Sequence, residues 1–251
     1  MSDSPKAVVV GASSGIGASI ARALAGRGFH VALVARREQE LNDLADRIND
    51  IAGRKLATVY AADVTDFESV PALFGSIVCD LGGLDLIVYA SGIMPKIGST
   101  EYSFEKDRKI IEVNVLGAIV WLNLAAERFE KQKGGAIIGI SSVAADRGRR
   151  GTPVYNTSKA ALDTYLEALR NRLSRYGVHV LTIKPGFVAT DMLTGVKLPP
   201  FPRPITADEA ARQTLAALDN HDQVRYVPGI WRWAGLLIRN LPSPIMQRIN
   251  I

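Results

Sequence analysis

The stretch Lys6-Ala-Val-Val-Val10 runs directly into Gly11-Ala-Ser-Ser-Gly15-Ile-Gly17, after which Ile16, Ile20 and Leu24 recur at helical spacing. The pattern predicts a buried strand, a glycine turn and a helix. Glycines let the backbone turn sharply and approach a pyrophosphate, and the helix N-terminus offers unpaired N–H donors and partial positive charge. We therefore expect this turn to bind a dinucleotide, although the same residues could form a turn with a structural role only.

Short β-branched runs recur along the chain and are separated by longer helical patterns. Most of these runs are apolar almost throughout, as expected for strands that helices cover on both faces of a parallel sheet. Seven runs are strand candidates: Lys6–Val10, His30–Ala35, Lys55–Tyr60, Leu84–Tyr89, Ala136–Ile140, His179–Lys184 and Arg225–Val227. The alternation predicts an α/β fold with one doubly wound parallel sheet of the Rossmann type. With 47% hydrophobic residues, we expect residues 1–251 to form a single dinucleotide-binding domain.

The chain is basic, with a formal net charge of +5 and a pI near 9.4. This balance favours anionic partners, and because no recognisable nucleic-acid module accompanies the basic residues, we expect no nucleic-acid partner. Cys79 is the single cysteine and the three histidines lack metal-ligand spacing, so neither a disulfide framework nor a metal site is expected. The polar N-terminus lacks a signal pattern and no apolar run approaches the length of a membrane span, which favours a cytoplasmic protein.

Two arginines follow the second strand candidate, where NAD-binding versions of this fold carry an acidic residue that binds the adenosine ribose. Arg36 and Arg37 suit a 2′-phosphate and offer no carboxylate acceptor, so NADP(H) is preferred over NAD(H). The alternative is a solvated basic start of the next helix. Asp63, after the third strand candidate, could accept a hydrogen bond from the adenine amine or could form a turn.

Tyr155 and Lys159 are four residues apart in a helical pattern, so both side chains lie on one face. An unperturbed tyrosine has a pKa of about 10, too high for an efficient base near neutrality. A cation held nearby favours the phenolate and brings the pKa toward the working pH, as general acid/base chemistry requires. A Tyr–Lys pair at this spacing is by itself more often an exposed surface pair.

With these residues in place, the sequence resembles the short-chain dehydrogenase/reductase family from Lys6 to about Met192. The resemblance rests on Gly11, Gly15, Gly17, Asp63-Val64, Asn114, Ser142, Tyr155, Lys159 and Lys184-Pro185-Gly186 continuing to Thr190. It implies that Tyr155 gives a proton to the carbonyl during reduction and accepts it during oxidation. Ser142 would hydrogen-bond the reacting oxygen, unless the adjacent Ser141 faces the substrate instead.

The same resemblance implies roles for the residues around Tyr155. Lys159 would bind the nicotinamide ribose and lower the pKa of Tyr155, Asn114 would hold a water linked to Lys159, and Thr190 would contact the carboxamide. Asn114 could also be a helix-packing amide. The expected cofactor contacts are Gly11, Ser13, Ser14, Gly15, Ile16, Gly17, Arg36, Arg37, Asp63, Val64, Ser91, Gly92, Asn114, Tyr155, Lys159, Pro185, Gly186, Val188 and Thr190.

One stretch departs from the family. Where Asn-Asn-Ala-Gly is common after the fourth strand, this chain has Tyr89-Ala90-Ser91-Gly92. Both asparagines are missing, so the hydrogen bonds beside the cofactor must be built differently, and Ser91 could contribute to them.

Two segments are candidates for setting the substrate. Asp146-Arg-Gly-Arg-Arg150 places three arginines between Ser142 and Tyr155, where they could bind an anionic group or form a solvated basic loop. Residues 191–207 include a proline-rich stretch past the sixth strand, and we expect them to form a substrate lid. Thr206 and Glu209 have capping-box spacing and should begin the next helix.

The C-terminal segment 229–251 has no acidic residue and carries arginines among Trp231, Trp233, Leu236 and Leu237. Such a cationic amphipathic segment can lie in a membrane interface, or it can pack on its own domain or across a subunit interface. Its sequence and the basic loop also resemble the branch that contains decaprenylphosphoryl-2-keto-ribose reductases, which implies a hydrophobic or lipid-linked substrate.

Together these features predict an NADP(H)-dependent oxidoreductase that interconverts a ketone or aldehyde and an alcohol by hydride transfer. The alternative is a non-catalytic nucleotide-sensing or interaction protein on the same fold. Family resemblance implies a homodimer or homotetramer. A cytoplasmic location is expected, with membrane contact at the inner face through segment 229–251 as a further possibility.

Overall fold

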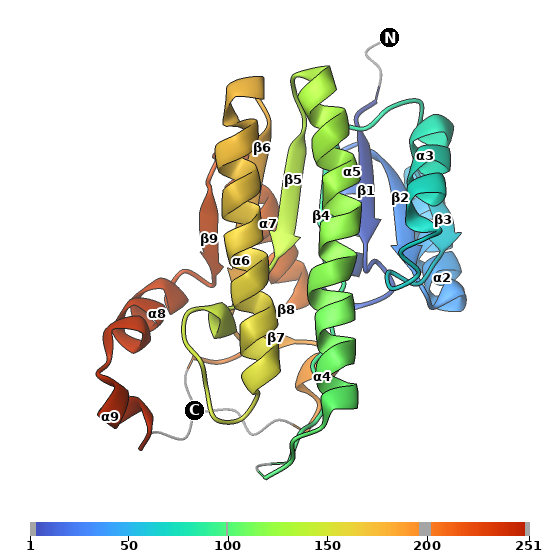
Figure 1. Cartoon of the computed structure of the whole chain (residues 1–251). Helices are drawn as coiled ribbons and strands as arrows, with labels where there is room; N and C mark the ends of the chain where they lie inside the picture. Colours follow the sequence, from blue (N-terminus) through green and yellow to red (C-terminus); the bar gives the residue numbers. More distant parts are fainter. Residues whose placement is uncertain (1–3, 99, 196–201, 249–251) are drawn as a thin grey trace.

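A seven-stranded parallel sheet with the strand order β3-β2-β1-β4-β5-β6-β9 forms the centre of the computed structural model, which describes residues 4–98, 100–195 and 202–248. Helices lie on both sides of the sheet (Figure 1), which confirms the predicted Rossmann-type fold. The strands of this sheet are β1 (Lys6–Val10), β2 (His30–Ala35), β3 (Ala57–Ala61), β4 (Leu86–Tyr89), β5 (Ala136–Ile140), β6 (His179–Pro185) and β9 (Val224–Val227).

The predicted strand bounds are correct within two residues, and the largest differences are at the starts of β3 and β4. β3 begins at Ala57 instead of Lys55, because the side chain of Asn49 accepts hydrogen bonds from the N–H groups of Leu56 and Ala57. β4 begins at Leu86 instead of Leu84. The backbone N–H of Ala136 donates to the Asp85 carbonyl just ahead of this strand.

Apolar side chains from the strands divide between two core layers, one on each face of the sheet. In β1, Ala7 and Val9 enter one layer, and Val8 and Val10 enter the other. This is why most of the strands are apolar along almost their whole length. The first layer packs against α1 (Gly15–Gly26), α2 (Glu38–Ala52) and α7 (Ala207–Asp219), and the second against α3 (Val70–Leu81), α5 (Gly117–Gln132) and α6 (Pro153–Leu173). Short helical turns η2 (Val143–Ala145) and η3 (Ser174–Tyr176) follow β5 and α6, and a third, η4 (Asp191–Leu193), comes after β6.

A continuous helical run joins α4 (Phe104–Ile111), the π-helical turn η1 (Glu112–Leu116) and α5. By length and composition this run of 29 residues could cross a membrane. Half of its most apolar window is buried inside the domain, and Trp121, Leu122 and Phe129 belong to the core. It therefore has the character of a core helix.

A second, two-stranded sheet pairs β7 (Val188–Ala189) with β8 (Ile205–Thr206) at the two ends of the expected lid. Residues 196–201 of that lid lie outside the described residues. Thr206 accepts a hydrogen bond from the N–H of Glu209 at 3.1 Å and caps α7, so the predicted helix start is confirmed.

The C-terminal helices α8 (Trp231–Asn240) and α9 (Ser243–Met246) follow β9, and α8 lies near the carboxyl end of that strand (Figure 1). Trp231 is buried and stacks edge-to-face on Phe187, with ring centroids 5.1 Å apart. A Cβ on Gly235 would lie 2.5 Å from Asp146 Oδ2, so α8 approaches the loop after β5 closely. The segment thus packs on its own domain through one side of α8.

Candidate active site

The sequence-predicted site residues gather at the carboxyl ends of the central strands. The glycine turn follows β1, Ser91 and Gly92 follow β4, Ser142 follows β5, and Gly186 follows β6. The strand order reverses between β1 and β4, the two strands from which the chain goes to opposite sides of the sheet. Open parallel sheets bind ligands at this switch point.

The glycine turn leaves no space for side chains. Gly11 has φ +91°, and a Cβ there would lie 2.4 Å from the backbone nitrogen of Ser91. A Cβ on Gly17 would lie 2.1 Å from the Gly11 carbonyl oxygen. Ser14 is the N-cap of α1, yet its side chain makes no capping hydrogen bond. The first turn of α1 therefore keeps N–H donors available for an anionic group, as a dinucleotide site requires.

Arg37 reaches across to the glycine turn. Its guanidinium donates to Ser14 Oγ at 2.6 Å and to Ser13 Oγ at 3.0 Å, and it lies 3.6 Å from Glu40. The side chain is 46% exposed, so it is held beside the turn and still accessible. This placement differs from a freely solvated helix start.

Arg36 points to the loop after β3, where its Nη1 lies 3.5 Å from Asp63 Oδ2. The other oxygen of Asp63 accepts hydrogen bonds from the N–H and hydroxyl of Thr65, at 2.9 and 2.8 Å. These bonds to Thr65 and the charge of Arg36 hold the pKa of Asp63 below its usual value, although partial burial opposes them. Asp63 is thus a turn former, and the adjacent Val64 is buried.

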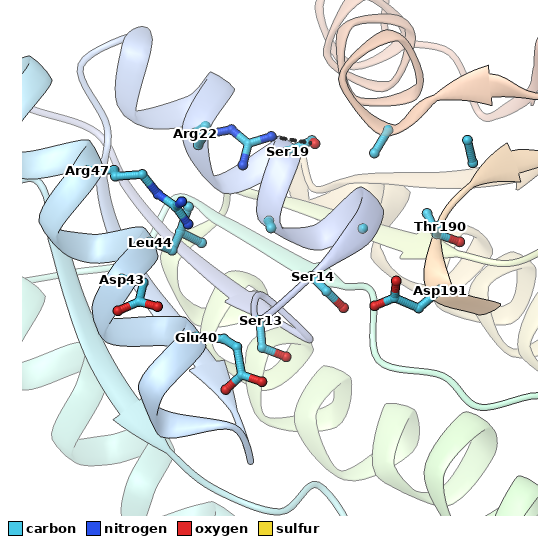
Figure 2. Close-up of a pocket in the computed structure, with 14 residues that line it drawn as sticks. Ser13, Ser14, Ser19, Arg22, Glu40, Asp43, Leu44, Arg47, Thr190 and Asp191 are labelled. Atoms are coloured by element: carbon cyan, nitrogen blue, oxygen red, sulfur yellow. Dashed lines mark hydrogen bonds between the residues drawn. The ribbon is translucent and has the colours of Figure 1, made fainter. Parts of the chain in front are cut away.

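A cavity of about 370 Å³ opens beside the N-terminus of α1 (Figure 2). Ser13, Ser14 and Gly15 line it together with Thr190. Its other walls include Glu40, Asp43 and Arg47 from α2 and Asp191. Thr190 approaches the turn closely, because a Cβ on Gly15 would lie 3.1 Å from its methyl group. The cavity joins two predicted cofactor segments, but Tyr155 and Lys159 are not among its lining residues.

Tyr89, at the point where the family asparagines are missing, makes a buried hydrogen bond of its own. Its hydroxyl is fully buried and donates to the Val113 carbonyl at 2.6 Å. Asn114 adds a second link, since its Oδ1 accepts from the N–H of Ile93 at 2.8 Å and its Nδ2 donates to the Ile93 carbonyl at 3.1 Å. The strip after β4 is therefore attached to η1. No hydrogen bond from the Ser91 side chain is seen in the described part of the chain.

Asn114 is fully buried and also donates to Ser158 Oγ at 3.0 Å on α6. A Cβ on Gly92 would lie 3.4 Å from Lys159 Nζ and 3.5 Å from Asn114 Oδ1. Because Gly92 has no side chain, Lys159 and Asn114 can both lie close to its backbone. Asn114 has packing contacts of the kind expected for a structural amide, and it lies close to Lys159.

Lys159 and Tyr155 are both buried on one side of α6, as their spacing predicts. Lys159 Nζ donates to the Ile140 carbonyl at 2.9 Å and lies 5.8 Å from the centre of the Tyr155 ring. Burial lowers the pKa of Lys159 to about 8, and the charge of Asp163 opposes this shift. A lysine with such a pKa titrates near physiological pH.

Burial raises the pKa of Tyr155, while a hydrogen bond with Ser142 and the positive charge of Arg149 lower it. Ser142 is at the N-cap of η2, where its Oγ also accepts from the N–H of Ala144 at 3.1 Å. Ser141 instead donates to the Lys159 carbonyl at 3.3 Å. Of the two serines, Ser142 is the one that interacts with Tyr155.

Comparison with known proteins fixes the family. A family model described as short chain dehydrogenase matches residues 5–199. The chain belongs to the short-chain dehydrogenase family. An uncharacterized oxidoreductase of Staphylococcus epidermidis is 35% identical over 189 residues, covering 75% of this chain and 80% of that protein. An uncharacterized oxidoreductase of Myxococcus xanthus is 37% identical over 186 residues, covering 74% and 73%.

Solved structures give the same assignment. A short-chain dehydrogenase from Sphingobium yanoikuyae in complex with NADPH aligns with a TM-score of 0.83 and 26% identity, covering 95% of this chain and 97% of that one. A single-substitution variant of actinorhodin polyketide ketoreductase with NADPH aligns with a TM-score of 0.78 and 25% identity, covering 86% and 90%. The chain is thus an oxidoreductase of the short-chain dehydrogenase family with a nucleotide-binding Rossmann fold.

In this short-chain dehydrogenase, a buried ionic cluster lies behind the catalytic candidates, and sequence reasoning missed it. Lys184 Nζ pairs with Asp163 Oδ2 at 2.8 Å and with Asp146, whose carboxylate also accepts from Tyr226 Oη at 3.1 Å. The Lys184 and Asp146 side chains are 8% and 4% exposed. The one signal in the sequence is a lysine near the end of a mainly apolar strand, since a buried lysine requires a partner.

Gly186, just after β6, is packed against Trp231 of the C-terminal segment. A Cβ on Gly186 would lie 1.9 Å from Trp231 Nε1. Pro185 and Val188 are buried, and Thr190 Oγ1 donates to the Val188 carbonyl at 3.3 Å. Ile16 is partly buried against the first core layer. The structure therefore places the predicted residues of this segment between the glycine turn and α8.

Proposed function

We propose that this short-chain dehydrogenase is an NADP(H)-dependent enzyme that interconverts a ketone or aldehyde and an alcohol by hydride transfer. The observation that carries the proposal is the buried group Ser142, Tyr155 and Lys159 at the carboxyl end of β5. Burial of a lysine and a phenol side by side is costly for stability and is typical of a site where proton transfer is tuned.

The residues of the glycine turn fit a dinucleotide. The close approaches at Gly11 and Gly17 leave bare backbone, and the uncapped N-terminus of α1 offers N–H donors to a pyrophosphate. Lys159 and Thr190 would hold the nicotinamide half, and Asp63 and Val64 would flank the adenine. When bound, the cofactor supplies the hydride or accepts it.

Side chains of the protein itself would donate and accept the proton. Tyr155 Oη donates its proton to the carbonyl oxygen during reduction and takes it back during oxidation, and Ser142 Oγ–H donates a second hydrogen bond to the same oxygen. Two donors in fixed positions favour the negative charge that develops on this oxygen. Protonated Lys159 would favour the tyrosinate that remains after the transfer.

Arg37 supports a preference for NADP(H). Its guanidinium already spans Ser13 and Ser14 beside the turn and can bind a 2′-phosphate with parallel N–H donors. The NADPH complexes of the two structural relatives agree with this preference. Arg36 adds positive charge nearby, although Asp63 partly offsets it.

The proposal is tested by measuring oxidation of NADPH and NADH by the purified protein with a panel of polar, hydrophobic and lipid-linked carbonyl compounds. We expect turnover with at least one carbonyl and higher kcat/KM with NADPH. NADPH binding with no turnover on any carbonyl would favour the alternative, a nucleotide-sensing protein on the same fold. A preference for NADH would contradict the assignment of Arg37.

We further propose that residues 1–251 form one catalytic domain, with residues 191–207 as lid and segment 229–251 as a contact with an anionic membrane surface at the cytoplasmic face. On α8, Trp233, Leu236 and Leu237 are 67%, 53% and 65% exposed. Arg232 and Arg239 accompany them, and no acidic residue follows Asp222. An apolar face with cationic flanks suits anionic lipid headgroups, and a nearby membrane would suit a hydrophobic or lipid-linked carbonyl substrate.

Sedimentation with vesicles tests the membrane contact. We expect binding to phosphatidylglycerol vesicles at low salt, weakened by salt and by Trp233→Ser with Leu237→Ser. The exposed apolar residue Ile51, on α2, provides the control variant Ile51→Ser. Protein that stays in the supernatant at low salt would exclude the contact. If the apolar face instead joins a homodimer or homotetramer, the α8 variants would lower the sedimentation coefficient.

A further inference from the structure

The three arginines of the loop between Ser142 and Tyr155 contact different parts of the protein. Arg147 Nη1 donates to the Arg239 carbonyl at 2.8 Å, and Arg150 Nη2 donates to the Gln247 carbonyl at 2.8 Å. These two side chains connect the loop to the C-terminal segment. The expectation that the arginines act together on the substrate therefore does not hold for them.

Arg149 turns toward the catalytic residues instead. Its Nη2 donates to the carbonyl of Val143, the residue after Ser142, at 3.2 Å. Its Nε is buried and donates to no atom of the described residues. An unsatisfied buried N–H costs about 1–3 kcal/mol, and a guanidinium has five donors of which this geometry uses one. The side chain is therefore partly buried and has a buried Nε–H donor without a protein partner, as an arginine that binds a ligand can have.

The positive charge of Arg149 also has no ion-pair partner among the described residues. The charge of Asp146 raises the pKa of Arg149, but Asp146 itself is paired with Lys184. The positive charge of Arg149 also lowers the pKa of Tyr155, and Arg149 Nη2 contacts the Val143 carbonyl next to Ser142. Burial lowers the pKa of Arg149 itself, and an anionic ligand would relieve that cost.

We propose that Arg149 binds an anionic group, a carboxylate or a phosphate, of the carbonyl substrate beside Tyr155. This inference rests on the proposed function and names the substrate class. A guanidinium with its Nε and Nη donors free can bind two oxygens of such a group in parallel.

The test uses three small probes that share one ring: phenyl phosphate, benzoate and benzyl alcohol. Each is titrated calorimetrically into wild-type protein, Arg149→Gln, Arg149→Lys and the matched control Arg150→Gln, with and without saturating NADPH. Arg37→Ala is titrated in parallel, so that phosphate binding at the cofactor turn is recognised. Circular dichroism establishes that each variant is folded.

We expect at least one anion to bind saturably with NADPH present, and its Kd to rise by about tenfold or more in Arg149→Gln. Arg149→Lys should weaken binding less, and Arg150→Gln should leave it unchanged. Binding of phenyl phosphate alone identifies a phosphate site, and binding of benzoate identifies a carboxylate site. Anion affinity that is equal in wild type and Arg149→Gln, or absent in wild type, overturns the inference.

These titrations need no turnover, so they are separate from the proposed function. If no carbonyl is reduced but the anion site depends on Arg149, the reductase proposal fails and the binding site remains. If NADPH oxidation proceeds with neutral carbonyls and no anion binds, the reductase stands and the role of Arg149 fails.

Discussion

Lys159 is a charged group placed in the interior beside a phenol. The residue is 4% exposed, and among the described residues its ammonium donates to one acceptor, the Ile140 carbonyl. Burial favours its neutral form, whereas Asp163, one turn further along α6, favours the charged form. The balance between these two effects decides the charge that Tyr155 experiences at a given pH.

The rate of carbonyl reduction should therefore fall at alkaline pH. Lys159 is protonated below its pKa of about 8 and loses its charge as the pH rises through that value. We expect kcat/KM to be constant below this pH and to decrease above it. In Asp163→Asn the pKa of Lys159 should fall further, so the decrease should begin at lower pH. A decrease at the same pH in both proteins would contradict this account of Lys159.

Arg37 is the residue that distinguishes the two cofactors in this account. Loss of a charged, hydrogen-bonded phosphate contact costs about 1.5–3 kcal/mol, which is roughly a tenfold or greater loss of affinity. Arg37→Ala should raise the Kd for NADPH by this factor and leave the Kd for NADH nearly unchanged. Arg54→Ala, an exposed arginine just after α2, is the matched control. Equal losses for both cofactors would show that Arg37 does not contact the 2′-phosphate.

Single residues differ in how far the sequence predicts them. The Tyr155–Lys159 spacing predicts a shared helix face, and the glycine spacing predicts a turn without side chains, because both depend on local geometry. The pairing of Lys184 with Asp146 and Asp163 was not predictable in this way, since the partners come from separate elements. Likewise, only the structure shows that Arg149 contacts the backbone beside Ser142, whereas Arg147 and Arg150 contact the C-terminal segment.

Among the elements, α8 connects the C-terminal segment to the catalytic loops. Its buried side places Trp231 against Gly186 and Gly235 against Asp146. The opposite side leaves Trp233 and Leu237 exposed. The sequence predicts an amphipathic helix here, and only the structure shows that its inner side rests on two loops of the site.

Gly235→Ala should destabilise the protein. Alanine ordinarily stabilises a helix interior by about 0.8–1 kcal/mol relative to glycine. Here the new Cβ would lie 2.5 Å from Asp146 Oδ2, so we expect overpacking to lower the free energy of unfolding by about 1–3 kcal/mol. Urea denaturation measures this change. Gly229→Ala, where a Cβ meets nothing within 4 Å, should have little effect, and a more stable Gly235→Ala protein would show that α8 is not packed as described.

Elements with strong periodicity were predictable, and short irregular ones were not. Most strands of the main sheet are mainly apolar runs between helical patterns. The pair β7–β8 has only two residues in each strand, and the π-helical turn η1 interrupts an otherwise helical pattern. Neither carries a period that distinguishes it in the sequence. Yet η1 places Asn114 and the Val113 carbonyl against the strip after β4.

For the molecule as a whole, the parallel sheet brings segments far apart in the sequence to one edge. The glycine turn, the strip after β4, the start of α6 and α8 all lie near the carboxyl ends of the strands. The sheet topology follows from the alternation of strands and helices, and so the general location of the site does too. Substrate contacts depend on loops whose conformation the pattern does not determine.

The most direct test of the central claim is transfer of deuterium from NADPH labelled at C4 of the nicotinamide, in each of its two stereochemical forms. Wild-type protein is mixed with a carbonyl compound that it reduces, and the alcohol is analysed by mass spectrometry in a single turnover. We predict deuterium on the carbinol carbon from one of the two forms. Tyr155→Phe should lower the rate by about 10²–10⁴-fold while binding NADPH with similar affinity. An undiminished rate in Tyr155→Phe, or an alcohol without deuterium, would contradict hydride transfer with Tyr155 as the acid.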